Sequence, residues 1–271
     1  MKTFFFWLIL SLNFSENLQI MKKLIFLFPL IILLWSCSSS IDTVNLSPED
    51  RLKNAIKLYE DEDDEEAVKE FEAILLQYSG SSIIDDAQFY IGKTRFQRGE
   101  YIIAAYEFSK LIKNMPASSF VPDAQLMLAE CYFELSPNYN LDQAYTKKAI
   151  GEFQAFIDFF PLNEKVHDAE EKINLLNLKL AKKDFLIANI YSKMDYYTAS
   201  MKYYDYVVET YHDTEYASKA LYKKIMLLLE RERDDEALVD MKKFILLFPD
   251  VEESQEIREI KDSLEGKISS N

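Results

Sequence analysis

Few side chains in this 271-residue sequence are suited to catalysis or metal binding. Cys131 has no disulfide partner if the only other cysteine, Cys37, is modified, and we interpret it as an apolar core residue. The two histidines, His167 and His212, lie at expected helix boundaries and are interpreted as surface or capping residues. A catalytic thiol would need a positioned base. The sequence therefore predicts no catalytic, cofactor or metal site, and no enzyme.

Acidic residues are abundant, and six of them are consecutive at positions 61–66. A calcium loop of the EF-hand type is one interpretation, but the run lacks the glycine and the alternating ligands of such a loop. We favour a solvated turn followed by the first turn of a helix, where the helix dipole favours carboxylates. A net charge of −15 also predicts that the chain repels nucleic acid.

Cys37 is the one residue for which the sequence predicts a chemical modification. A basic segment at 21–23 precedes the eleven-residue apolar run 24–34, which ends at Leu34-Trp35-Ser36-Cys37. This order is typical of a secretory signal, and the run is too short to span a bilayer of about 30 Å. Its end resembles a bacterial lipobox, whose cysteine is diacylated, although Trp35 departs from the usual small residue. An uncleaved anchor helix is the alternative.

These features divide the N-terminal part of the chain. We expect a signal peptide at 1–36, with Met21 as the true start, and a lipidated cysteine and polar tether at 37–47. The residue after the cysteine is Ser38 rather than aspartate, which in sorted lipoproteins favours the outer membrane. The expected location is its periplasmic face.

A recurring frame organises the rest of the sequence. Gly92 is followed after twelve residues by Ala104, after four more by Phe108, and after eight more by Pro116. A small residue, an alanine, an aromatic residue and a helix-ending proline at this spacing match the tetratricopeptide pattern. Two intervals between copies are longer by 8 and by 14 residues, which predicts a loop near 136–138 and about four extra turns of one helix. The other copies are Ala55-Ala67-Phe71-Ser79, Ala129-Ala149-Phe153-Pro161, Ala188-Ser200-Tyr204-His212 and Ile225-Ala237-Met241-Pro249.

The pattern predicts an all-α, tetratricopeptide-type solenoid of about five helix-turn-helix repeats. Repeats 1–3 occupy 48–165, and repeats 4–5 with a capping helix occupy 166–271. The expected helices are Pro48–Glu60, Ala67–Tyr78, Asp85–Gln97, Tyr101–Asn114, Asp123–Leu135, Leu141–Phe160, Val166–Lys193, Tyr196–Tyr211, Tyr216–Glu230, Asp235–Leu247 and Glu252–Lys267.

Residues 37–260 together resemble the BamD family, the tetratricopeptide lipoproteins of the outer-membrane β-barrel assembly machinery. The resemblance rests on the lipobox, the order of the repeats, the Phe160-Pro161 and Phe248-Pro249 endings, the insertion at 140–144 and the long helix. It implies a non-enzymatic scaffold that helps to insert outer-membrane proteins. The implied partners are a BamA-like barrel protein bound by the C-terminal repeats, other subunits of the complex, unfolded substrate C-termini bound by the N-terminal repeats, and outer-membrane lipid reached through the anchor.

In this repeat class the first helix of each pair lines the concave surface, which predicts a peptide groove on the first three repeats. One row of lining residues is Tyr59, Phe96 and Phe133, and a second row is Leu52, Phe89 and Leu126. The rings could instead pack between repeats. Other functions also remain open: an adaptor of peptidoglycan or cell-division machinery, a glycan-binding import lipoprotein, or an enzyme.

Overall fold

The structure, a computed structural model, describes residues 46–270, so the signal peptide, Cys37 and most of the tether lie outside the described residues. A compact unit begins at Pro48. Its described residues form eleven helices and no strand. These are α2 (Pro48–Glu60), α3 (Asp64–Gln77), α4 (Ile84–Gln97), α5 (Tyr101–Asn114), α6 (Val121–Glu134), α7 (Ala144–Phe159), α8 (Val166–Lys193), α9 (Tyr197–Thr210), α10 (Glu215–Glu230), α11 (Asp234–Leu247) and α12 (Ser254–Ser270).

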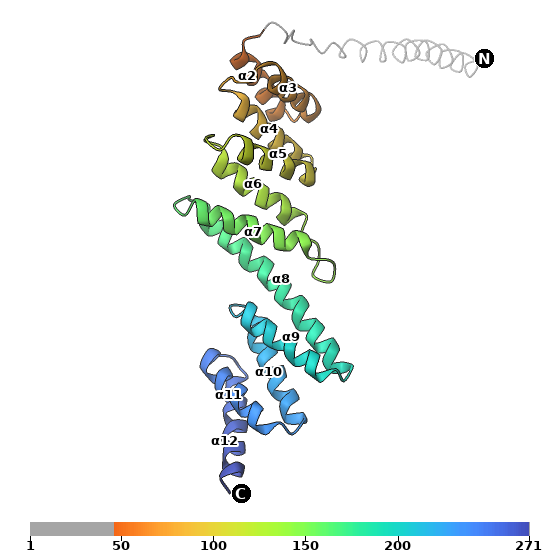
Figure 1. Ribbon diagram of the computed structural model, residues 1–271, viewed down its shortest axis with the longest axis vertical. Coiled ribbons are helices and arrows are strands. Elements are labelled where there is room, and N and C mark those ends of the chain that lie inside the picture. Colours follow the sequence, from red (N-terminus) through yellow and green to blue (C-terminus); the bar gives the residue numbers. More distant parts are fainter. Residues whose placement is uncertain (1–45, 271) are drawn as a thin grey trace, which may run out of the picture. The chain divides into compact units, whose positions relative to one another are not determined.

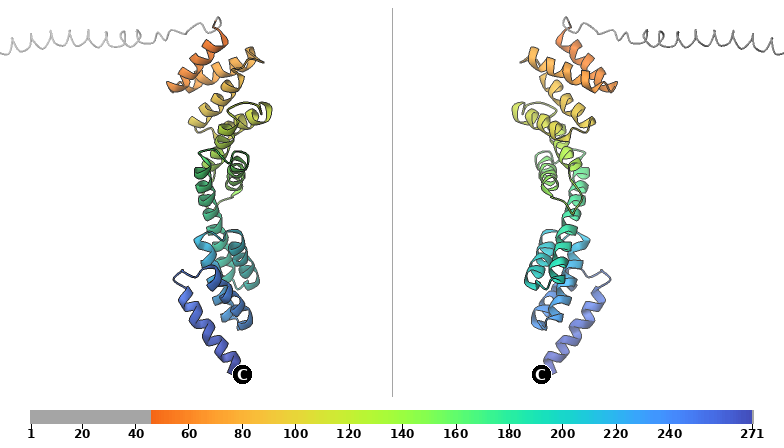
Figure 2. Two further views of the ribbon diagram at one scale, coloured as in Figure 1. Left: turned by 90° about the vertical axis from the view of Figure 1, so that its left-hand side faces the viewer. Right: turned by 90° about the vertical axis from the view of Figure 1, so that its right-hand side faces the viewer.

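Each helix packs against the next along the chain from α2 to α12, as in a solenoid (Figures 1 and 2). Short turns join the helices of four of the five pairs, the exception being α6 and α7, and the all-α prediction is confirmed. The helix with the predicted extra turns, α8, is 28 residues long and has the expected bounds. It is the longest of the described helices because no proline or glycine interrupts its apolar face.

The small and aromatic positions of the repeats meet inside the helix pairs. Phe108 and Phe153 are fully buried, as are Ala104 and Ala149. Gly92 of α4 lies directly under the Phe108 ring of α5: a β-carbon at Gly92 would come within 2.6 Å of Phe108 Cε1. The residues that recur in the sequence pattern are therefore the ones that form the close contacts between the two helices of a pair.

The turns inside the pairs share an unusual backbone conformation. Glu62, Gly99, Asp195 and Glu232 all have positive φ, between 56° and 72°. Glu62 and Gly99 are 37 residues apart, and so are Asp195 and Glu232. Only one of these four equivalent positions has the glycine that adopts this conformation without strain.

The predicted loop insertion is present between α6 and α7, but α7 begins at Ala144 rather than at the expected Leu141. The side chain of Gln143 explains the difference, because its amide folds back and donates to the carbonyls of Asn138 at 2.8 Å and Leu141 at 3.0 Å. The Asp142 carboxylate accepts from the backbone N–H of Ala144 at 2.9 Å and forms a turn directly before the helix.

The buried apolar residues form four clusters that follow one another along the helices. The first lies between α2, α3 and α4, and the second between α4, α5 and α6. A third cluster joins α6 and α7 to Leu176 of α8, and a fourth joins Leu180 of α8 to α9, α10, α11 and α12. The core is thus a chain of local contacts between neighbouring repeats, which is how solenoids bury apolar surface.

Candidate functional site

The isolated residues with reactive side chains are placed as predicted. Cys131 is fully buried in the second cluster, and burial raises the pKa of its thiol to about 12. His167 and His212 are exposed and form ion-pair contacts with Glu171 and Asp213 when protonated. No cluster of metal-ligating residues occurs within residues 46–270. In the same range, no helix has the length and apolar character needed to cross a membrane.

The first row of predicted groove residues is half-buried. Tyr59 of α2 meets Tyr90 edge to face, with ring centroids 5.5 Å apart. Phe96 of α4 packs in the same way on Tyr101 at 5.1 Å. Phe133 of α6 lies edge to face on the buried Phe153 at 6.3 Å. Each ring in this row therefore uses part of its surface for packing and keeps part accessible.

The second row is divided between core and surface. Phe89 is buried because Phe120, in the connection between α5 and α6, stacks on it at 4.7 Å. Leu126 is buried in the third cluster. Leu52 is half-buried and packs at the edge of the first cluster. Phe89 and Leu126 therefore offer no surface to a ligand, and of this row only Leu52 remains a candidate.

Buried polar pairs connect the two helices of each of the first three repeats. Arg51 Nε donates to Glu70 Oε2 at 2.8 Å, and the next two repeats place glutamine at the same position. The Gln88 and Gln125 amides donate to Glu107 Oε2 at 2.7 Å and Glu152 Oε2 at 2.8 Å. Because a buried donor needs its acceptor, these pairs fix how the helices of a repeat are aligned. Sequence reasoning missed them, although all three follow the repeat frame.

The turn between α8 and α9 exposes apolar and aromatic side chains. Ile190, Met194 and Tyr196 are each more than half exposed. Tyr191 stacks on Tyr203, with centroids 5.4 Å apart, and Tyr191 and Tyr196 line an open hollow of about 530 Å³. Tyrosine and methionine are enriched at protein interfaces. This turn is therefore a candidate protein-binding surface.

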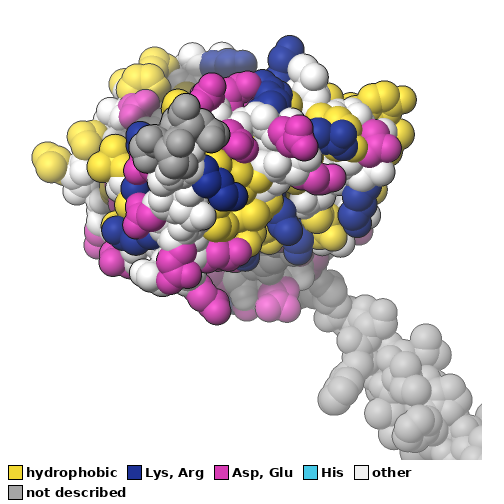
Figure 3. Space-filling model, turned by 90° about the horizontal axis from the view of Figure 1, so that it is seen from below, with side chains coloured by type: hydrophobic (Ala, Val, Ile, Leu, Met, Phe, Trp, Pro, Cys, Tyr) yellow, Lys and Arg dark blue, Asp and Glu magenta, His cyan; other side chains and the backbone are white. Residues whose placement is uncertain are grey.

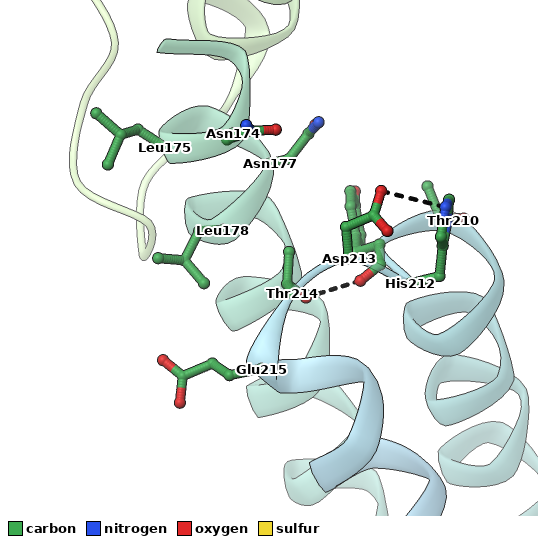
Figure 4. Close-up of a pocket in the computed structure, with 10 residues that line it drawn as sticks. Asn174, Leu175, Asn177, Leu178, Thr210, His212, Asp213, Thr214 and Glu215 are labelled. Atoms are coloured by element: carbon green, nitrogen blue, oxygen red, sulfur yellow. Dashed lines mark hydrogen bonds and ion pairs between the residues drawn. The ribbon is translucent and has the colours of Figure 1, made fainter. Parts of the chain in front are cut away.

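A second pocket, of about 640 Å³, lies between the middle of α8 and the turn that joins α9 to α10. The carboxamides of Asn174 and Asn177 extend from α8 toward the turn that carries His212 and Asp213 (Figure 4). The Thr214 hydroxyl donates to the carbonyl of Tyr211 at 2.8 Å, so it is not aligned with His212 for attack on a substrate. The pocket offers hydrogen-bonding groups rather than a catalytic arrangement.

Charges of both signs cover the surface. Seen from the C-terminal end, acidic and basic side chains alternate, with apolar side chains between them (Figure 3). In the fifth repeat, Lys224 of α10 bridges Asp205 Oδ1 at 2.6 Å and Asp240 Oδ2 at 2.9 Å. These two carboxylates therefore help to hold α10 against α9 and α11.

The repeats, their paired helices and their stacked order define a tetratricopeptide-type helical repeat protein. The model of the YfiO family, described as an outer membrane lipoprotein, matches residues 45–238, and the chain belongs to that family. The outer membrane protein assembly factor BamD of Rickettsia prowazekii is 26% identical over 222 residues, covering 81% of this chain and 88% of that protein. The BamD of Caulobacter vibrioides is 26% identical over 172 residues, covering 64% of this chain and 56% of that protein.

Solved structures of tetratricopeptide repeat proteins also align with the chain. A repeat protein of Bacteroides fragilis is 13% identical with a TM-score of 0.44, covering 82% of this chain and 99% of that one. A structure of the MamA protein is 16% identical with a TM-score of 0.38, covering 74% and 91%.

Proposed function

We propose that this protein is a non-enzymatic lipoprotein scaffold that helps to insert and assemble β-barrel proteins in the outer membrane. The observation that carries this proposal is the family match over residues 45–238, together with relatives named as assembly factors of outer membrane proteins. The surfaces described above suit binding rather than chemistry. No observation favours the alternative role as an adaptor of peptidoglycan or cell-division machinery.

The proposed anchor is a lipid on Cys37, which would hold the repeats at the periplasmic face of the outer membrane. Stable anchoring needs more than one acyl chain, as a diacylated cysteine provides. Replacing Cys37 with serine should remove acyl labelling and release the protein from membranes. Retention of both label and membrane association in the Cys37→Ser variant would refute the anchor.

The proposed dock for a BamA-like barrel protein and its associated subunits lies on the fourth and fifth repeats. The exposed Met194 and Tyr196 at the α8–α9 turn supply the apolar anchors that interfaces use. The test is co-purification from detergent-solubilised membranes. Deleting residues 213–271 should abolish it, and the double variant Met194→Ser/Tyr196→Ser should weaken it without a change in thermal stability. Leu76→Ser on α3, an exposed apolar residue that is distant in sequence, is the control and should leave co-purification intact.

The proposed substrate site is a groove on the first three repeats, bordered by Leu52, Tyr59, Phe96 and Phe133. It would receive the C-terminal segments of unfolded outer-membrane proteins, whose apolar side chains could each gain about 1.5–3 kcal/mol on burial. Phe96→Ser should weaken binding of such a peptide and leave thermal stability nearly unchanged. A large loss of stability, or unchanged affinity, would show that Phe96 only packs between helices.

A further inference from the structure

A lysine ammonium lies among the aromatic rings of the first two repeats. The Lys93 ammonium of α4 is 5.0 Å from the ring centroid of Tyr59, 5.1 Å from that of Tyr90 and 6.0 Å from that of Phe89. Within residues 46–270, Lys93 makes no ion pair with a carboxylate. The charge is held in place by rings of α2 and α4, which attract cations through their faces.

In the third repeat, an ammonium over aromatic rings is compensated by a carboxylate. Lys172 of α8 also lies over two rings, 5.1 Å from the Phe133 centroid and 5.8 Å from that of Phe153. It forms an ion pair with Glu130 of α6. Glu130 and Lys93 occupy the same position of their repeats, 37 residues apart. The third repeat therefore supplies its own carboxylate, whereas the second repeat presents an ammonium with no counter-charge of its own.

The position of Lys93 places this charge beside the proposed groove. Lys93 is four residues after Phe89 and three before Phe96, so it shares a face of α4 with both. Tyr59, whose ring the ammonium contacts, and Phe96, three residues further along α4, are half-buried. If Lys93 binds the terminal carboxylate of a peptide, the side chain of the peptide's last residue would therefore lie within reach of this aromatic surface.

The ammonium also has free hydrogen-bonding capacity. It has three N–H donors, and aromatic faces attract its charge without supplying the oxygen acceptors that a carboxylate offers. Charge-assisted hydrogen bonds are the stronger class, and the apolar rings around Lys93 reduce the screening by water. In a chain of net charge −15, an unpaired cation in a groove also favours one anionic group over the many neutral ones of a polypeptide.

We propose that Lys93 binds the terminal carboxylate of the peptide in the groove, with the last aromatic side chain of that peptide packed against Tyr59 and Phe96. This inference rests on the proposed substrate groove, and it places the C-terminal end of the bound peptide at Lys93. The site recognises the chain end itself, so an internal segment of the same sequence binds less well.

The experiment measures binding of two synthetic peptides to the full chain in detergent. Both peptides have the last residues of an outer-membrane protein and end in phenylalanine, one as the free acid and the other as the amide. We expect the free acid to bind about tenfold more tightly, which corresponds to about 1.4 kcal/mol. The Lys93→Met variant keeps an apolar stem over the rings and should bind both peptides equally. Lys113→Met, an exposed lysine of α5 with the same change in net charge, is the matched control and should keep the tenfold preference.

The outcomes separate the two proposals. Equal binding of acid and amide by the wild-type protein overturns the role of Lys93 and leaves the groove in place. A preference that persists in Lys93→Met assigns the carboxylate to another group and also overturns the proposal. Absence of binding of either peptide refutes the groove and this inference together.

Discussion

Adding one methyl group at Gly92 tests the closest contact in the fold. In an exposed helix, replacing glycine with alanine stabilises by about 1 kcal/mol. At Gly92 the new methyl carbon would lie 2.6 Å from Phe108 Cε1 and 2.8 Å from Cδ1 and Cζ, whereas carbon atoms normally meet at about 3.5–4.0 Å. Phe108 is fully buried and packs on Phe89 with ring centroids 5.8 Å apart, so its ring has little room to move.

Overpacking of a core costs about 1–3 kcal/mol, and three simultaneous short contacts place this site near the upper end. After the helix gain of about 1 kcal/mol is subtracted, we expect Gly92→Ala to lower the free energy of unfolding by about 2 kcal/mol. In a domain of this size that loss lowers the melting temperature by roughly 4–8 °C. Urea and thermal unfolding followed by far-UV circular dichroism measure both quantities.

Gly151 of α7 provides the control, because a methyl group there would have no neighbour within 4 Å. Gly151→Ala should raise stability by about 1 kcal/mol, opposite in sign to Gly92→Ala. Phe108→Leu should lower the free energy of unfolding less in the Gly92→Ala background than in the wild type, because the smaller leucine side chain relieves the short contact. The reasoning is refuted if Gly92→Ala stabilises the protein as Gly151→Ala does.

Four further predictions concern single sites. Phe153→Ala should destabilise by about 3–5 kcal/mol in urea unfolding, because the ring is fully buried; a loss below 1 kcal/mol, roughly that of a surface change, would contradict its burial. Glu232→Gly should stabilise by about 0.5–1 kcal/mol, since glycine relieves the positive φ of 56° at a smaller entropic cost; lower stability would be inconsistent with strain there. Burial raises the pKa of Asp184 above its ordinary 3.8, so its charge opposes folding at neutral pH, and Asp184→Asn, which still accepts from Tyr211, should raise the melting temperature at pH 7. That advantage should disappear below pH 3.8, where the carboxyl is protonated in both states. In Cys37→Ser protein, Cys131 should react with iodoacetamide only after unfolding, and labelling of the folded protein would show that the thiol is accessible.

The helices could be predicted closely because each is marked by independent local signals. The expected bounds of α5 and α8 agree with the structure to the residue. The start of α7 was misplaced by three residues because Gln143 and Asp142 form side-chain contacts that no periodicity reveals. The groove was harder still. Periodicity places Phe89 and Phe96 on one face of α4, but whether a ring is covered depends on connections such as the one that carries Phe120. The unpaired state of Lys93 could not be predicted, since it depends on which carboxylates lie nearby in space.

Helix α8 has a consequence for how the protein unfolds. Leu176 belongs to the third apolar cluster and Leu180 to the fourth, and the two residues are one helical turn apart. Repeat proteins with only weak contacts between repeats can lose them one at a time from the ends. Here the two halves share the unbroken helix α8. Unfolding of either half therefore removes packing from the same helix against which the other half packs. We therefore expect the middle of α8 to couple the two halves, so that they unfold in a single cooperative transition rather than one after the other.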